Sequence, residues 1–142
     1  MKPVCIENIS NQSIPRLTQL EKLASTIMKL ERPGPINLVF CTNSYIRKLN
    51  HQFRRLDKAT DVLSFIYEEP EILGEIYISV EMARAQAIKW ENTYYQELKR
   101  LIIHGCLHLA GYDHHSKKDR NHMRKKEEAY LFGKKLVYYG KS

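Results

Sequence analysis

The sequence is poor in several features that define large classes of proteins. Its 142 residues contain three cysteines, at positions 5, 41 and 106, and no two of them form a C-x-x-C pair. This argues against a disulfide framework or a zinc ribbon, so we expect three reduced thiols that pack as small apolar groups. No apolar run approaches the roughly 18 residues of a membrane span. The N-terminal residues reach the carboxylate of Glu7 before a signal-peptide core could form, so we expect a cytoplasmic protein without membrane contact.

Acidic residues are also fewer than basic ones. The chain has 23 Lys and Arg against 16 Asp and Glu, which gives a net charge of +7. A polyanion such as nucleic acid suits that charge, but many small proteins are basic without such a partner. Hydrophobic residues make up 43% of the chain, which argues against disorder. The length predicts a single catalytic domain over residues 1–142.

The periodicity of apolar residues predicts an α+β fold, with a small mixed sheet of about four strands covered by about five helices. The expected strands are 3–8, 36–41, 60–65 and 74–80, with an exposed turn at 68–71. The expected helices are 15–30, 43–53, 81–90, 93–109 and 116–133.

Four of the six histidines fall within residues 104–115, and three of them have a spacing typical of a metal site. His104 and His108 are one helical turn apart, about 40° around a helix and about 6 Å along it, so both can reach one ion. His114 would lie on the far side of a continued helix. It can join the pair because Gly111 can adopt the left-handed conformation that ends a helix.

Three imidazole nitrogens and one open position are typical of a catalytic zinc site, and we expect one Zn²⁺ per chain. Zinc lowers the pKa of a bound water to about 7, which points to hydrolysis. Nickel or copper would also bind such donors. The spacing matches that of zincin-like metal helices in metzincin peptidases, but their general-base Glu is replaced by Gly105, which disfavours a peptidase mechanism.

Residues 104–114 also match the signature H-G-x-x-H-x-x-G-Y-D-H at every fixed position. Two further stretches, 50–65 and 74–78, support the same relationship. Through these motifs the sequence resembles the YbeY family of bacterial endoribonucleases over about residues 36–131. It departs from the family pattern at Glu75, where aspartate is commoner, and by the additional His115.

The resemblance implies a metal-dependent endoribonuclease that acts on single-stranded RNA, notably the precursor of small-subunit ribosomal RNA. It also implies a role in ribosome quality control and contact with ribosomal particles. The metal ligands would be His104, His108 and His114, and the family's functional arginine matches Arg54.

Elementary chemistry offers a role for Arg54, because a guanidinium binds phosphate through two donors and stays charged. Without the resemblance, Arg54 reads as an ordinary surface charge. Asp113 could orient a ligating histidine from behind, or brace the turn at Gly111. Arg55, Lys117 and Lys118 are candidate RNA-binding residues, although a solvated helix face explains such lysines equally well.

Two other functions stay open at this point. One is a ribosome-associated assembly factor with a structural metal, and the other is a metallohydrolase with a different substrate, such as a peptide. For a nuclease, the sequence favours neither water nor the RNA 2′-OH as the attacking group.

Overall fold

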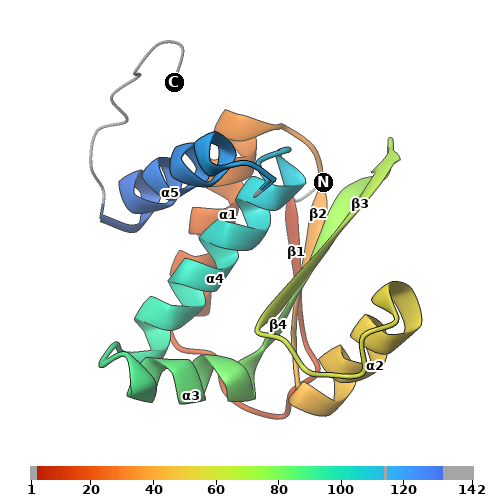
Figure 1. The fold of residues 1–142 in the computed structure, drawn as a ribbon, viewed down its shortest axis with the longest axis vertical. Helices are drawn as coiled ribbons and strands as arrows, with labels where there is room; N and C mark the ends of the chain where they lie inside the picture. The colour runs from red at the N-terminus through yellow and green to blue at the C-terminus, as the bar shows by residue number, and fades with distance from the viewer. Residues whose placement is uncertain (1–2, 114, 133–142) are drawn as a thin grey trace.

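The computed structural model describes residues 3–113 and 115–132 and confirms the α+β prediction (Figure 1). It contains four strands and five helices: β1 Val4–Asn8, α1 Leu17–Glu31, β2 Ile36–Cys41, α2 Asn43–Arg54, β3 Val62–Glu69, β4 Ile72–Ser79, α3 Val80–Lys89, α4 Tyr94–Leu109 and α5 Lys117–Phe132. Within this part of the chain no helix combines the length and apolarity needed to cross a bilayer.

The four strands form one mixed sheet in the order β1-β2-β4-β3. The strands β1, β2 and β4 run parallel, with Ile6 beside Leu38 and Leu38 beside Ile76. The last strand, β3, pairs antiparallel with β4 and forms one edge of the sheet. Because β3 has a neighbour on one side only, one row of its peptide groups is available to side chains.

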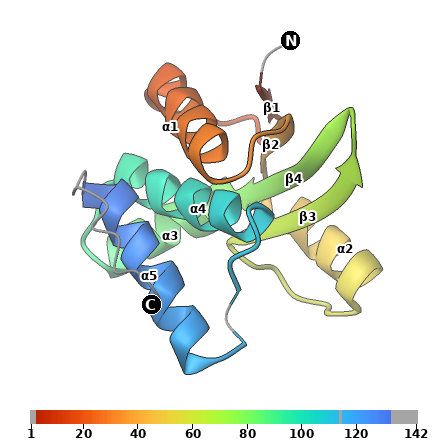
Figure 2. The same ribbon diagram turned by 90° about the horizontal axis from the view of Figure 1, so that it is seen from above.

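Helices cover the two faces of the sheet unequally (Figure 2). The helices α1 and α4 lie on one face, with α3 and α5 packed outside α4. Within the described residues, α2 is the one helix on the opposite face. The main core lies under α4, where Phe40, Ile76, Ile78, Leu101 and Ile102 are fully buried.

Two glycines allow α4 to lie unusually close to the sheet. A Cβ atom on Gly105 would come within 2.7 Å of Ile76 Cγ2, and one on Gly74 within 2.7 Å of Leu109 Cδ2 and 2.4 Å of the Phe65 carbonyl oxygen. Both positions therefore exclude a side chain. The backbone of α4 rests directly on β4 at the histidine motif.

Two sequence-based expectations need correction. The predicted turn at residues 68–71 is much shorter, because β3 continues to Glu69 and β4 begins at Ile72. A register shift between Ile66 and Glu69 lets this polar end of β3 stay paired. Cys5 was expected to pack as an apolar group, yet it is exposed on β1, whereas Cys41 and Cys106 are buried as expected; all three are free thiols.

The carboxylate of Glu31, at the end of α1, joins three segments around the C-terminal end of α4. It accepts hydrogen bonds from Tyr112 (2.9 Å), from Lys126 (3.2 Å) and from the hydroxyl of Tyr130. Burial alone would raise the pKa of Glu31, but these three donors together outweigh burial and lower it below its usual value. Glu31 thus holds α5 and the turn after α4 against α1.

We expect Glu31→Gln to lower the free energy of unfolding by roughly 1–3 kcal/mol at pH 7, because Lys126 loses its partner in a half-buried place. A lowered folded-state pKa stabilises the protein above the pKa of an unfolded glutamate, about 4.3. The difference between wild type and variant should therefore shrink as the pH falls through that range. Urea unfolding at several pH values measures it.

Glu128, an exposed glutamate on α5, provides the matched control. Glu128→Gln should leave stability nearly unchanged at every pH. Equal effects of the two substitutions would contradict the role assigned to Glu31.

Candidate active site

The helix α4 is fixed at both ends by local signals in the sequence. At its start, the Thr93 side chain accepts from the Gln96 backbone N–H, and the Gln96 side chain accepts from the Thr93 N–H. At its end, Gly111 has φ of +105°, as its predicted role requires. The Gly111 and Tyr112 N–H groups then bond to the carbonyls of His108 and Leu107, which closes the helix.

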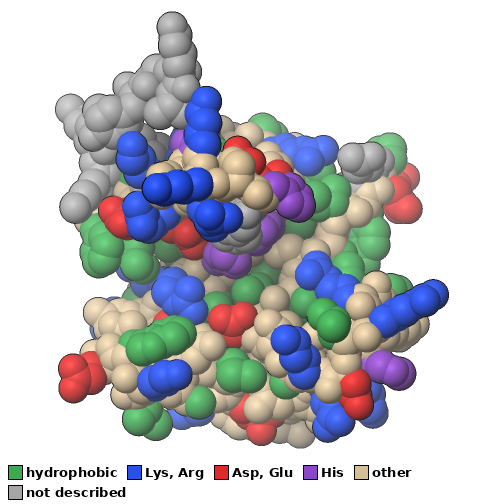
Figure 3. All heavy atoms as spheres, in the orientation of Figure 1, with side chains coloured by type: hydrophobic (Ala, Val, Ile, Leu, Met, Phe, Trp, Pro, Cys, Tyr) green, Lys and Arg blue, Asp and Glu red, His purple; other side chains and the backbone are tan. Residues whose placement is uncertain are grey.

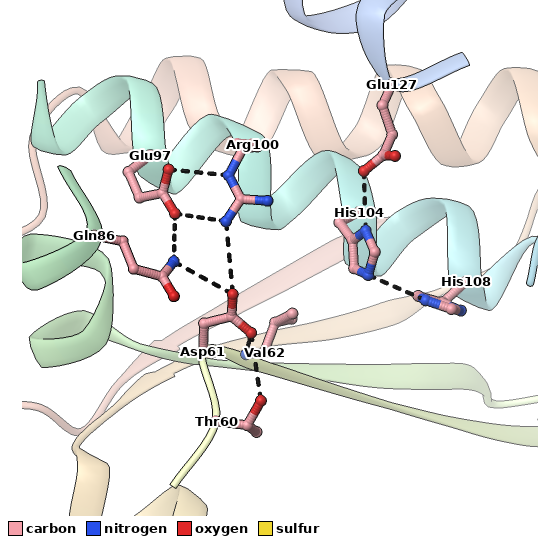
Figure 4. A network of polar contacts seen from close by, with 9 residues as sticks. All are labelled: Thr60, Asp61, Val62, Gln86, Glu97, Arg100, His104, His108 and Glu127. Atoms are coloured by element: carbon pink, nitrogen blue, oxygen red, sulfur yellow. Dashed lines mark hydrogen bonds and ion pairs between the residues drawn. The ribbon is translucent and has the colours of Figure 1, made fainter. Parts of the chain in front are cut away.

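One face of α4 carries a line of ionisable side chains toward the start of β3 and toward α5 (Figure 4). The line consists of Glu97, Arg100, His104 and His108, spaced three or four residues apart. Such spacing places side chains on one side of a helix. The opposite side of α4 bears the apolar core residues. The ionisable side chains therefore lie along the border of the core.

His104 and His108 converge as their spacing predicts. Their Nε2 atoms are 3.1 Å apart, and the ring centroids are 4.6 Å apart. His104 is about three-quarters buried, so the pair lies in a partly enclosed place. Two imidazole nitrogens aimed at a common point can serve as donors to a single ion.

Glu127 of α5 lies behind His104, with its Oε2 atom 2.9 Å from His104 Nδ1 (Figure 4). A neutral His104 that donates from Nδ1 to this carboxylate carries its lone pair on Nε2, on the side of His108. Sequence reasoning missed this contact. The partner of Glu127 is 23 residues away, and no local spacing marks the pair.

The predicted third ligand, His114, lies outside the described residues. Among residues 3–113 and 115–132, no set of three His, Cys, Asp or Glu side chains is grouped as a metal site. The structure thus brings together two of the predicted ligands and adds Glu127 to them.

A second polar cluster lies two turns earlier on α4 (Figure 4). Glu97 is fully buried and binds the Arg100 guanidinium through both oxygens, at 2.7 and 3.0 Å. Asp61 approaches Arg100 to 3.6 Å and accepts from the Gln86 amide, which also donates to Glu97. The cluster joins α3 and α4 to the start of β3, so it positions the edge strand beside the histidines.

Arg54 occupies the far side of that edge strand. Its Nη2 atom donates to the Ser64 carbonyl at 3.3 Å, and its guanidinium lies 5.9 Å from the Phe65 ring centroid. The Ser64 hydroxyl donates to the Gly105 carbonyl on α4 at 3.3 Å. Arg54 and His104 are therefore linked through one residue of β3 and one of α4.

Asp57 and Asp61, the carboxylates that follow Arg54 in the chain, bind elsewhere. Asp57 pairs with Arg47 at 2.8 Å, and this guanidinium lowers the pKa of the Asp57 carboxyl. Asp61 belongs to the cluster with Arg100. The position of Arg54 thus rests on β3 itself.

The remaining candidate residues lie around this centre. Asp113 accepts from the backbone N–H of His115 at 3.2 Å, a bond that lowers the pKa of its carboxyl and braces the turn after Gly111. Arg55 ends α2 in a left-handed conformation and is exposed. Lys117 and Lys118 line a hollow on α5 with His122 and Lys125.

The surface view shows how charged and histidine side chains are distributed on this side of the molecule (Figure 3). Lys and Arg side chains gather over α5, and His side chains lie in the hollow below them. The lower side of the hollow is formed by the part of the molecule that carries α2 and α3. A basic rim around partly enclosed imidazoles suits an anionic ligand.

Comparison with known proteins now adds to this geometry. The family model described as endoribonuclease YbeY matches residues 5–134. The chain belongs to the YbeY endoribonuclease family. It is 41% identical to the endoribonuclease YbeY of Desulforamulus reducens, an alignment that covers 79% of this chain and 84% of the relative. The Acholeplasma laidlawii relative is 36% identical, with 87% and 93% covered.

The fold also resembles a solved structure of similar length. A solution structure from Thermotoga maritima matches with a TM-score of 0.63 and 32% sequence identity. That match covers 98% of this chain and 99% of the other. The four-stranded sheet and its helices are thus an arrangement seen experimentally in a similar protein.

The glycine at position 105 gives a direct test of the site's support. We expect Gly105→Ala to lower the free energy of unfolding by roughly 1–2 kcal/mol, because the new methyl group meets Ile76 in the core. An ordinary helical glycine would gain up to about 1 kcal/mol from the same change. Thermal and urea unfolding distinguish the two signs, and a stabilised variant would contradict the close packing.

Proposed function

We propose that this chain is a zinc-dependent endoribonuclease that cleaves single-stranded regions of ribosomal RNA precursors. The observation that carries the proposal is the convergence of the His104 and His108 Nε2 atoms, with Glu127 behind His104. Membership of the YbeY endoribonuclease family supports the reaction type. Contact with ribosomal particles, a part in ribosome quality control and a cytoplasmic location belong to the same proposal.

The described donors fit a metal ion of the zinc class. Two imidazoles supply neutral nitrogen donors, and Glu127 selects the tautomer of His104 that carries its lone pair on Nε2. We infer from the sequence motif that His114 provides the third donor. When bound, the ion would supply a Lewis acid for a phosphoryl oxygen and would acidify water at neutral pH.

In this proposal, basic side chains of the chain bind the negatively charged substrate. Arg54 presents a permanent positive charge beside the edge strand, with donors aimed at the Ser64 carbonyl and others directed to solvent. A phosphodiester placed between Arg54 and the histidines would bind the guanidinium, and the added charge of the transition state would bind it more tightly. Arg55, Lys117 and Lys118 extend the positive surface along the RNA. Asp113 stabilises the turn that leads to His114.

The structure bears on the peptidase and the assembly-factor alternatives in different ways. A peptide-hydrolysing site of the metzincin type needs a carboxylate at position 105, and Gly105 lies against Ile76 with no room for one. An assembly factor with a structural metal keeps the histidine pair but requires no exposed arginine at β3. The partly enclosed histidines, linked to Arg54 through Ser64 and Gly105, favour the enzyme.

Glu127 gives a prediction that does not depend on catalysis. Glu127→Ala should weaken zinc binding by roughly 10–100-fold, because His104 loses the acceptor that fixes its tautomer and orientation. Competition with a chelating dye measures the affinity. The neighbouring exposed Glu128→Ala serves as control, and equal affinities in both variants would contradict the role of Glu127.

Arg54 gives the catalytic prediction. Arg54→Ala should reduce kcat for a single-stranded RNA about 100-fold or more, with the fold and zinc content unchanged, because the guanidinium acts on charge that grows in the transition state. Arg55→Ala should mainly raise KM in a salt-dependent way.

Lys89→Ala, at the end of α3, is the exposed control. Cleavage that survives both Arg54→Ala and His108→Ala would locate the activity elsewhere. If wild type binds ribosomal particles but cleaves no RNA, the assembly-factor alternative holds instead. The chemistry of the product ends, 5′-phosphate or cyclic phosphate, identifies the attacking group.

A further inference from the structure

The sheet face opposite α4 carries a group of aromatic side chains that the proposed reaction does not use. We call the aromatic face the set Tyr45, Phe53, Phe65, Tyr67 and Tyr77. Phe65 and Tyr77 come from β3 and β4, and Tyr45 and Phe53 come from α2. Apolar side chains are visible at the surface of the β3–β4 hairpin in Figure 3.

The rings form a continuous series of contacts. Phe53 meets Phe65 edge to face at a centroid distance of 5.5 Å, and Phe65 meets Tyr77 in the same way at 5.9 Å. Tyr77 stacks on Tyr45 at 6.1 Å. Phe65 and Tyr77 are half-buried, whereas Phe53 is 60% exposed, Tyr67 42% and Tyr45 39%. Such a series supports its own ring orientations and still presents open ring surface.

A half-buried carboxylate fixes two of the rings further. Glu75 accepts from the hydroxyls of Tyr67 (2.7 Å) and Tyr77 (2.9 Å) and from the Asn37 amide (3.1 Å). Burial raises the pKa of Glu75, but these hydrogen bonds outweigh it, so the carboxylate is ionised and its acceptors are occupied. The tyrosine hydroxyls are thus satisfied within the protein, and the rings need no partner for them.

The aromatic face is continuous with the candidate active site around the edge of β3. The Arg54 guanidinium lies over the Phe65 ring and donates to the Ser64 carbonyl. Ser64 reaches across to the Gly105 carbonyl, next to His104 in the chain. Phe53 directly precedes Arg54 on α2. A strand whose phosphate binds Arg54 therefore passes next to Phe65 and the open ring of Phe53.

We propose that the aromatic face, with Phe53 as its most exposed ring, stacks bases of single-stranded RNA next to the phosphate bound at Arg54. This inference rests on the proposed function and specifies how its substrate is held. Aromatic rings stack with any base, so this subsite would select unpaired bases without reading their sequence. A duplex keeps its bases stacked inside and cannot supply them.

The chemistry of the surface favours RNA over a protein partner. A protein that covered these rings would also cover the Arg54 guanidinium and would have to supply an anion for it. A nucleotide supplies both, because its phosphate is the anion and its base is a planar ring in the same unit. The net charge of +7 favours the same polyanionic partner.

The test compares binding of matched oligonucleotides to the full-length zinc-loaded protein. The oligonucleotides are short single-stranded DNAs that differ only in the position of one abasic site. DNA is used because it is not an RNA substrate. In wild type, an abasic site at one or two positions should weaken binding about tenfold, within the fivefold to hundredfold range of stacking contributions. In Phe53→Leu, which keeps apolar bulk without a ring, the same abasic sites should have no further effect.

Two further variants complete the design. Phe53→Trp should bind at least as tightly as wild type, and Ile88→Ala, an exposed apolar change on α3, should leave binding unchanged. If abasic sites cost wild type and Phe53→Leu equally, the inference is wrong and the face serves another partner, such as a protein. If wild type cleaves RNA but Phe53→Leu has the same KM, the inference fails and the proposed function stands. If Arg54→Ala keeps full activity, the proposed function fails by its own test.

Discussion

The close approach of α4 to β4 is the constraint on which the rest of the structure depends. Gly105 over Ile76 and Gly74 under Leu109 bring a helix backbone and a strand into direct contact. That contact sets the height of α4 above the edge strand, and it allows Ser64 to bond to the Gly105 carbonyl. The imidazoles on the neighbouring turns are consequently carried at a fixed distance from β3 and from Arg54.

The same contact explains how much of the site was predictable. The glycine, the capping residues and the i, i+4 histidines act over a few residues, so the sequence predicts α4, its end at Gly111 and the convergence of His104 and His108. The partners of those residues come from distant segments. Glu127 meets His104 across 23 residues, and Glu31 meets Tyr130 across 99. No local sequence spacing predicts either contact.

The sheet shows a similar division. The apolar pattern gives β2 with the bounds it has in the structure, and it predicts the other strands to within a few residues. It does not give the order β1-β2-β4-β3, because parallel pairing depends on tertiary packing and not on the pattern of one strand. The edge position of β3, which gives Arg54 its carbonyl partner, was beyond sequence reasoning for this reason.

The carboxylates and the basic side chains are distributed differently over the structure. Glu31, Glu75 and Glu97 each accept from several donors, and Glu127 faces His104. Lys126 compensates the charge of Glu31 and Arg100 that of Glu97, both at junctions between elements. The basic residues of α5 and the end of α2 lie mostly at the surface, so cations gather around the hollow. An anionic chain that enters there meets cations first, then imidazoles, while the interior acids keep the elements in place.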